Sequence, residues 1–220
     1  MPVGSSGSVI HLRDAVVAPA GFPALAGATL DVKTGELVAL RGANGAGKTT
    51  LLRLCAGLAP LARGSASVLD VDLGADRSLV RRSVGFVGHR NGLYGELTAR
   101  ENISYTAALV GATRGEVDVV LKEFDLGGRL ADTRASALSA GQRRRTALAS
   151  LAIRRARLWL LDEPHAALDA ESRQQLERVF RLATASGVTV VYTTHEQHID
   201  SHSMPRTITL DAGRVVRDHA

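Results

Sequence analysis

Residues 42–49 carry the side chains best suited to chemistry: they read GANGAGKT and match the pattern G-x-x-x-x-G-K-[ST]. Glycines let backbone N–H groups curl around a polyphosphate, and a following helix points its N-terminal N–H groups at the same anion. Lys48 would add a positive charge beside the β- and γ-phosphates, while the Thr49 hydroxyl could ligate a bridging Mg²⁺. The predicted nucleotide-binding residues are Gly42, Ala43, Asn44, Gly45, Ala46, Gly47, Lys48, Thr49 and Thr50.

The segments on either side of this stretch fit the prediction. An apolar run, residues 37–40, precedes it, and residues 50–54, TLLRL, are compatible with a helix. Strand, loop and helix in that order is the context that a phosphate-binding loop requires. On these residues alone, a glycine-rich turn with a surface lysine remains the alternative.

A second candidate group follows the apolar run Leu158–Leu161, which we expect to be a strand buried on both faces. Asp162 and Glu163 come directly after it. Asp162 could join Thr49 in holding Mg²⁺, and Glu163 could polarise the water that attacks a γ-phosphate. The alternative is a strand whose terminal acids only face solvent.

Composition limits the class of protein. A chain of 220 residues that is 45% hydrophobic can form one large α/β domain with a packed core. The single Cys55 can form no intrachain disulfide and the start is unlike a signal peptide, so we expect a reducing cytosol. No apolar stretch approaches the ~20 residues that span a bilayer, so a membrane part would be another chain. The net charge of +5 allows nucleic acid, an anionic membrane surface or simple solubility, but dispersed arginines and few aromatics argue against nucleic acid.

The elements that must position these residues can be predicted from the sequence pattern. Short alternating segments at residues 9–12 and 30–32 indicate an antiparallel β unit before the nucleotide-binding strand. Residues 67–70 and 84–87 are expected to be strands, with a helical turn near residues 78–82 between them. Later, residues 188–192 are expected to form a strand and residues 208–216 a closing hairpin around Ala212-Gly213.

Between residues 93 and about 137 the pattern becomes helical. Capping-box sequences start at Thr98 and Thr113, each with Glu three residues on. Val117, Val120, Leu121 and Phe124 then fall on one helix face. A further helix is expected over residues 138–150 with Ser139 as its N-cap, and Leu176, Val179, Phe180 and Ala183 mark one face of another helix.

The segment LSAGQ, residues 138–142, resembles the LSGGQ signature of ATP-binding-cassette ATPases. The order of phosphate loop, signature, LLDEP and then His195 is also that of the family, and the resemblance runs from about Val9 to Val216. It implies an α/β fold with a P-loop NTPase (RecA-like) core, an N-terminal antiparallel β subdomain and an inserted α-helical subdomain at about residues 93–150. Residues 1–220 would then be a single nucleotide-binding domain.

The resemblance also implies a head-to-tail dimer, in which the signature of one subunit contacts the ATP held by Lys48 of the other. The implied signature residues are Leu138, Ser139, Ala140, Gly141 and Gln142. Asp169 resembles the D-loop aspartate of the family. His195 resembles its switch histidine, which would act with Glu163 in catalysis by hydrogen bonding to the γ-phosphate, whereas a strand-end histidine read alone would more often be structural.

Two features depart from the family pattern, and the arginines after the signature extend it. His89 stands where a strand normally leads to a Gln that touches Mg²⁺; since imidazole is a poor Mg²⁺ ligand, we expect an outer-shell or hydrogen-bonding role, or a plain loop histidine. The aromatic that usually stacks on adenine is absent, and the nearest ring, Phe22, is expected in the core. Arg145 matches the arginine of the family, while Arg143 and Arg144 are expected on a solvated helix face or a membrane-proximal patch.

Within the family, residues 88–93 (GHRNGL), residues 96–102 (ELTAREN) and LSAGQRRR resemble the ATP-binding subunit of the cytochrome c maturation haem exporter. This implies an ATPase that uses ATP and Mg²⁺ and lies peripherally on the cytoplasmic face of the membrane. It would pair with itself or a related ATPase and power haem export through separate integral membrane subunits. Two alternatives stay open. One is the ATPase of another exporter of drugs, lipids or peptides; the other is a soluble cassette protein acting on nucleic acid or ribosomes, although those usually carry two cassettes or long insertions.

Overall fold

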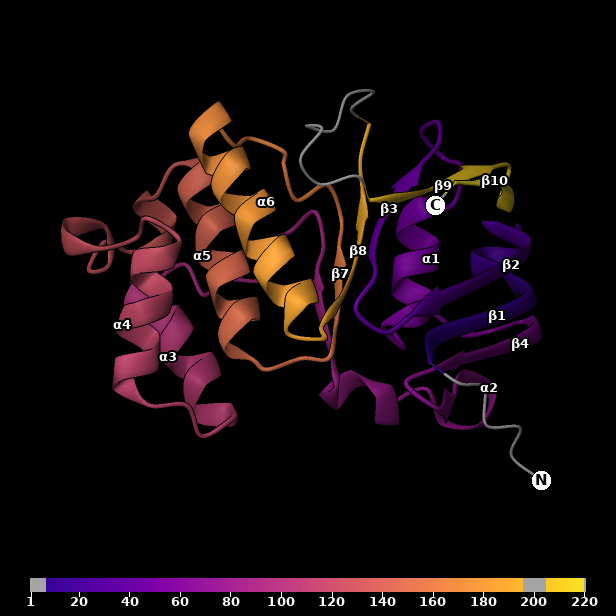
Figure 1. Ribbon diagram of the computed structural model, residues 1–220, viewed down its shortest axis with the longest axis horizontal. Coiled ribbons are helices and arrows are strands. Elements are labelled where there is room, and N and C mark those ends of the chain that lie inside the picture. The colour runs from indigo at the N-terminus through magenta and orange to yellow at the C-terminus, as the bar shows by residue number, and fades with distance from the viewer. Residues whose placement is uncertain (1–6, 196–204, 220) are drawn as a thin grey trace.

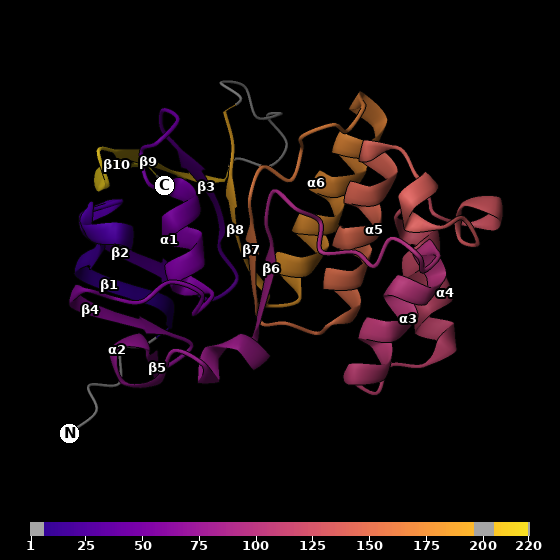
Figure 2. The same ribbon diagram turned by 180° about the vertical axis from the view of Figure 1, so that it is seen from behind.

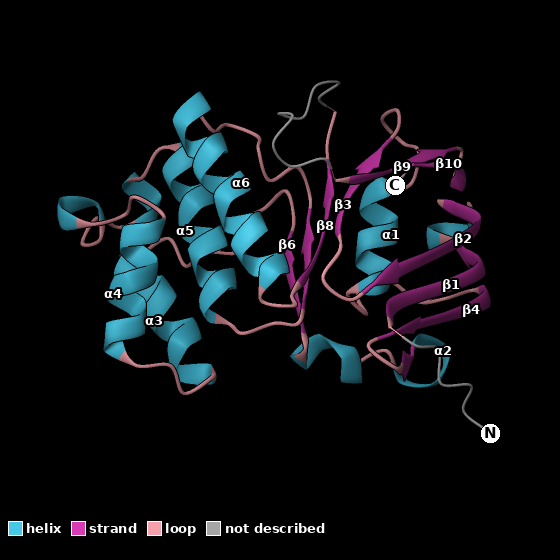
Figure 3. Ribbon diagram, viewed as in Figure 1, coloured by secondary structure: helices cyan, strands magenta, loops and turns pink. Residues whose placement is uncertain are grey.

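The computed structural model describes residues 7–195 and 205–219. It contains two β-sheets with helices between and beside them (Figure 3). The strands are β1 (Ser8–Val17), β2 (Leu25–Lys33), β3 (Leu37–Arg41), β4 (Arg63–Val68), β5 (Val71–Asp72), β6 (Val84–Val87), β7 (Leu158–Leu161), β8 (Thr189–Thr193), β9 (Arg206–Asp211) and β10 (Arg214–His219). The α-helices are α1 (Lys48–Cys55), α2 (Leu73–Asp76), α3 (Ala99–Leu109), α4 (Arg114–Glu123), α5 (Ala140–Ile153) and α6 (Ala170–Ala185).

The smaller sheet is antiparallel and has the strand order β2-β1-β4-β5. It confirms the predicted antiparallel unit, with strands β1 and β2 longer than the short segments that alternate in the sequence. The prediction of a strand over residues 67–70 is wrong at its end. Leu69 and Asp70 have φ values of 50° and 66°, so the chain turns there and returns as β5.

The larger sheet has the order β10-β9-β3-β8-β7-β6. Strands β6, β7, β8, β3 and β9 run parallel to one another, and β10 is antiparallel to β9. Strands β9 and β10 form the predicted hairpin, with Ala212 and Gly213 both at positive φ in the turn. Parallel strands end at the same edge of a sheet. The segments that follow β3, β7 and β8 therefore meet at one edge, although the first and the last of them lie more than 100 residues apart in the sequence.

Layers of helix and sheet bury both faces of the larger sheet, as Figures 1 and 2 show from opposite sides. Helix α1 lies between the two sheets, α5 and α6 cover the other face, and α3 and α4 lie beyond them. Strand β7 alternates between these layers: Leu158 and Leu160 belong to the core around α1, and Trp159 and Leu161 to the core around α5 and α6. All four residues are buried, which confirms the predicted two-faced strand.

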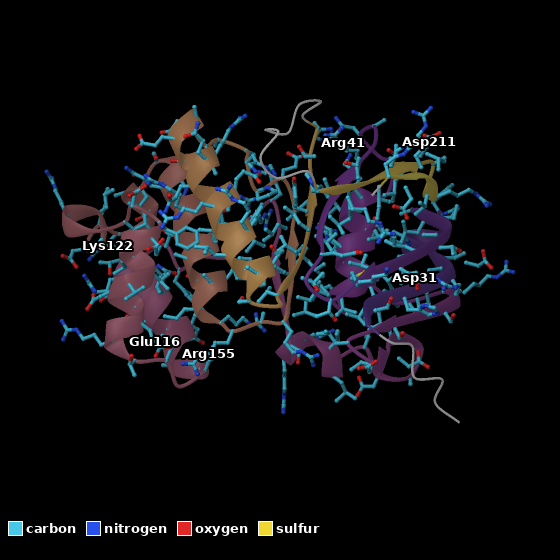
Figure 4. All side chains as sticks on the ribbon, in the orientation of Figure 1. Asp31, Arg41, Glu116, Lys122, Arg155 and Asp211 are labelled. Atoms are coloured by element: carbon cyan, nitrogen blue, oxygen red, sulfur yellow. The ribbon has the colours of Figure 1, made fainter. Side chains whose placement is uncertain are left out.

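The chain between β6 and β7 supplies helices α3, α4 and α5, in agreement with the predicted helical insertion. Thr98, Thr113 and Ser139 form the N-caps of these helices, each in a complete capping box. The carboxylate of Glu116, from the box of α4, also accepts a 2.6 Å hydrogen bond from Arg155, beyond the end of α5 (Figure 4). Of the helices in the described part of the chain, none combines the length and apolar character that crossing a bilayer demands.

Candidate nucleotide site

The loop between β3 and α1 has a backbone that only glycine allows at two of its positions. Gly42 has a φ of 142°, and a Cβ there would stand 2.2 Å from the Leu210 carbonyl oxygen. Gly47 has a φ of 102°, and its Cβ would stand 2.5 Å from the Ala24 carbonyl oxygen. Because L side chains rarely adopt these φ values and backbone atoms fill the space, the pattern of the sequence dictates the path of the loop. Helix α1 starts at the next residue, Lys48.

Lys48 places its amino group inside this loop. Its Nζ donates hydrogen bonds to the carbonyl oxygens of Gly42 at 2.8 Å and Ala43 at 3.0 Å, and the residue is 7% exposed. Burial lowers the pKa of Lys48, while the nearby carboxylates of Glu163 and Asp162 oppose that shift. The ammonium group thus lies within the curl of the loop, where a phosphate chain could meet it.

Asp162 is nearly buried and held by two hydroxyl groups. The Thr49 hydroxyl donates to its two carboxylate oxygens at 3.1 and 3.0 Å, and the Thr193 hydroxyl donates to Oδ1 at 2.9 Å. The hydroxyl of Thr49 and the carboxylate of Asp162 form a set of oxygen donors of the kind Mg²⁺ prefers. These two residues fit the predicted metal pair by their chemistry and by their proximity.

Glu163 has an uncommon backbone for a residue with a side chain, with a φ of 51°. Such a left-handed conformation costs about 1–3 kcal/mol and persists only where neighbouring groups enforce it. The N–H of Glu163 donates to the Thr193 hydroxyl at 2.8 Å. Its side chain remains 40% exposed, and its Oε1 lies 2.8 Å from Nε2 of His195. Glu163 is thus fixed at the backbone, with a carboxylate open to solvent and restrained by one histidine.

Lys48, Thr49, Glu163 and His195 line one pocket at the carboxyl edge of the larger sheet. The lining comprises Ala24, Asn44, Gly45, Ala46, Gly47, Lys48, Thr49, Thr50, Glu163 and His195. Most predicted nucleotide-binding residues and both predicted catalytic residues are therefore brought together by the fold. The sequence pattern did not predict the contact between His195 and Glu163 or the two hydrogen bonds of Thr193. A threonine that ends an apolar strand was the available signal for the second of these.

The predicted signature residues lie elsewhere, at the start of α5. Ser139 and Gln142 close the capping box of that helix, through Ser139 N–H to Oε1 at 2.8 Å and Gln142 N–H to Oγ at 3.2 Å. A Cβ on Gly141 would stand 2.8 Å from the Ala167 carbonyl oxygen, so this glycine packs closely against the chain two residues before Asp169, the predicted D-loop aspartate. Within the described residues, none of positions 138–142 lines the pocket at the phosphate loop.

Asp169, the predicted D-loop aspartate, caps the N-terminus of α6. Its carboxylate accepts a 2.8 Å hydrogen bond from the Ser172 N–H, which lowers the pKa of Asp169. His89 is exposed in the loop that follows β6. Neither side chain lines the pocket among the residues that the structure describes.

Two expectations about single residues are wrong. Phe22 is 81% exposed rather than part of the core, on the loop that leads to Ala24 in the pocket lining. Arg144 is 4% exposed rather than on a solvated face. The helical period contained the signal for the second error, because Arg144 shares the i, i+3, i+4, i+7 face of α5 with the buried Ala147, Leu148 and Leu151.

Comparisons with known proteins agree with this geometry. The profile of the family described as ABC transporter matches residues 25–166. The cytochrome c biogenesis ATP-binding export protein CcmA of Bordetella bronchiseptica is 43% identical over 168 residues, 76% of this chain and 75% of that protein. CcmA of Shewanella frigidimarina is 37% identical over 186 residues, 84% and 86% of the two chains. The dimeric, post-hydrolysis structure of the ATP-binding cassette MJ0796 with ADP and Pi superposes with a TM-score of 0.84 at 26% identity, over 96% of this chain and 97% of that one.

Proposed function

This chain belongs to the ABC transporter family, as one of its ATP-hydrolysing subunits, and we propose that two such subunits close over MgATP and drive export through separate membrane subunits. One observation carries the proposal. The phosphate loop, the Thr49–Asp162 pair and the Glu163–His195 pair converge at one sheet edge, while the signature at the start of α5 lies outside that pocket. A second copy, turned head to tail, would supply the missing signature to each pocket.

In the proposed reaction, each side chain of the pocket has a distinct task. Lys48 exchanges its bonds to the loop carbonyls for contacts with the β- and γ-phosphates. Mg²⁺, when held by Thr49 and Asp162, would neutralise charge on the phosphate oxygens. Glu163 orients a water molecule that attacks the γ-phosphorus, so that a new P–O bond forms and the bond to the bridging oxygen of ADP breaks. His195 restrains the Glu163 carboxylate before ATP binds and donates to the γ-phosphate afterwards.

The partner subunit would contribute the N-terminus of α5. Ser139 and Gly141 would approach the γ-phosphate from across the interface, where unpaired N–H groups of the first helical turn can bind an anion. The dimeric neighbour MJ0796, captured with ADP and Pi, supports a dimer as the working form. Asp169 would lie at the same interface, because Ala167, two residues before it, packs directly against the signature glycine.

We propose haem export in cytochrome c biogenesis as the transport process. Its support is the loop GHRNGL after β6, the signature LSAGQ, and two relatives named for cytochrome c biogenesis export. The protein would lie peripherally on the cytoplasmic face of the membrane and dock on integral membrane subunits. Affinity purification of the tagged chain from membranes tests this, with hydrophobic transporter subunits expected in the complex. Recovery of the chain with ribosomes or nucleic acid instead would contradict it.

Glu163→Gln tests the catalytic part of the proposal. The variant should bind ATP as the wild type does, lose ATP turnover, and remain as an ATP-bound dimer on gel filtration. Glu123→Gln, at the end of α4 and away from the pocket, serves as the matched control and should hydrolyse ATP normally. Wild-type turnover by Glu163→Gln would remove Glu163 from its role, and a variant that stays monomeric with ATP would contradict the closed dimer.

A further inference from the structure

Arg144 is a buried cation that the proposed mechanism does not use. It is 4% exposed and lies two residues after the signature, on the inner face of α5. Burial lowers the pKa of Arg144, opposed by the carboxylates of Asp162 and Glu163. Since a buried charge is costly unless its hydrogen bonds are satisfied, the acceptors that surround this side chain indicate what it does.

Arg144 donates to two separate segments of the chain. Its Nη1 reaches the Gly88 carbonyl at 2.8 Å and the Asn91 side-chain oxygen at 3.1 Å, in the loop after β6. Its Nη2 donates to the Asp162 carbonyl and, at 2.8 Å, to the Glu163 carbonyl. A longer contact of 3.5 Å joins Nε to the Pro164 carbonyl. Only the planar fork of a guanidinium offers enough donors in directions that serve both segments at once.

The segment held by Nη2 is the one with a strained backbone. Glu163 has a φ of 51°, and both its N–H and its carbonyl oxygen are hydrogen-bonded. The Thr193 hydroxyl accepts from its N–H, and Arg144 donates to its carbonyl oxygen. A residue in the left-handed region needs such restraints to stay there, and the direction of its side chain follows its backbone.

We propose that Arg144 is a positioning residue: it fixes the backbone of Glu163, and through it the carboxylate that orients water, against the start of α5 and the Gly88–Asn91 loop. This inference rests on the proposed role of Glu163 in ATP hydrolysis. It also means that the signature helix, the loop that carries His89 and the hydrolytic carboxylate of one subunit move as one unit. Any displacement of α5 would therefore change the position of Glu163 directly.

The test is Arg144→Lys, which keeps the charge but replaces the fork with a single amino group. We expect kcat for ATP hydrolysis to fall about 10- to 100-fold, because a misplaced catalytic group has an effect of this size. KM for ATP should stay within about threefold of the wild type, since the phosphate loop is untouched. Arg154→Lys is the matched control: it makes the same change at the other end of α5, where the guanidinium donates to the Arg81 carbonyl, and should keep wild-type kcat.

A double variant separates positioning from a general structural effect. In the Glu163→Gln background, Arg144→Lys should cause no further loss of residual turnover and should leave the ATP-bound dimer intact. A further loss of the same size as in the wild-type background, or an unchanged kcat in Arg144→Lys alone, would overturn the proposal. If Arg144→Lys does not fold, Asn91→Ala replaces it. That variant removes one acceptor, and a folded Asn91→Ala with wild-type kcat would then be the refuting result.

The same experiment keeps the two hypotheses apart. If Glu163→Gln hydrolyses ATP as the wild type does, the proposed role of Glu163 fails whatever Arg144→Lys does. If Glu163→Gln is inactive and Arg144→Lys is fully active, the role of Glu163 stands and only the positioning role of Arg144 fails.

Discussion

Thr193→Val makes a small change at a point where stability and catalysis meet. Thr193 ends β8 and is fully buried; its hydroxyl accepts the Glu163 N–H at 2.8 Å and donates to Asp162 Oδ1 at 2.9 Å. Valine keeps the shape and the β-branched character that suit a strand, so the substitution removes the two hydrogen bonds and little else.

The expected cost of this change follows from those two bonds. A hydrogen bond to an ionised carboxylate contributes ~1.5–3 kcal/mol, and an N–H left buried without an acceptor costs ~1–3 kcal/mol. Part of this is offset by burial of the new methyl group, so we expect the free energy of unfolding to fall by about 2–4 kcal/mol. For a chain of this length that is a decrease in Tm of about 4–16 °C. Because Asp162 and Glu163 each lose a restraint, kcat should also fall about 10- to 100-fold.

Thr189→Val is the matched control for Thr193→Val. Thr189 begins the same strand and is equally buried, and its hydroxyl also bridges two groups, accepting from the Gly35 N–H at 3.0 Å and donating to the Lys33 carbonyl at 3.4 Å. We expect a loss of about 1–3 kcal/mol in the free energy of unfolding and wild-type ATP turnover.

The assay for this pair is Tm by calorimetry together with steady-state ATP hydrolysis at 25 °C, below the unfolding transition of each variant. An equal loss of kcat in both variants would show that turnover follows stability alone. A wild-type kcat in Thr193→Val, with its Tm lowered as expected, would show that the restraint on Glu163 is irrelevant to hydrolysis. Either result would refute the reasoning.

Two further predictions concern other parts of the molecule. Phe22→Ala should weaken ATP binding by about tenfold without lowering Tm, because Phe22 is 81% exposed two residues before Ala24 of the pocket lining, and stacking on a base contributes ~1–3 kcal/mol. Isothermal titration checks this, and unchanged affinity would exclude stacking. Hydrogen bonds to the Glu116 carboxylate lower its pKa from 4.5 to about 2; the largest contribution comes from the Thr113 N–H and the next from Arg155. The stabilising effect of this carboxylate is thus present above pH 4.5 and lost as the pH falls toward 2. Arg155→Gln should raise the pKa measured by NMR titration, and an unchanged value would contradict the role of the ion pair.

The parts of the site that the sequence predicts well are those set by local backbone geometry. The loop around Gly42 and Gly47 depends on φ values of 142° and 102°, which glycine adopts readily and other residues rarely adopt. The capping boxes are equally local, since Thr98 or Ser139 needs only a partner three residues away. Such features are predictable because all of their determinants lie within one short segment.

The errors came from residues whose environment depends on packing between distant segments. Arg144 is read as a surface residue by its type, yet its acceptors come from loops that precede it by about fifty residues and follow it by about twenty. Phe22 is read as a core residue by its type, yet the short connection between β1 and β2 leaves it in solvent. Residue type predicts burial only on average, and the tertiary partners of a polar or aromatic side chain decide the individual case.

The comparison of Thr189 and Thr193 shows why the direction of the strands decides which polar side chain can be functional. The two threonines lie on the same strand, are both 0% exposed and each have a bridging hydroxyl, so neither residue type nor the two-residue period of the strand distinguishes them. They differ in the edge of the sheet to which they belong. Because β3, β7 and β8 run parallel, the phosphate loop, Asp162 and Glu163 gather at the edge of Thr193, while the edge of Thr189 carries the turns that enter the strands. A larger loss of kcat in Thr189→Val than in Thr193→Val would contradict this account of the site.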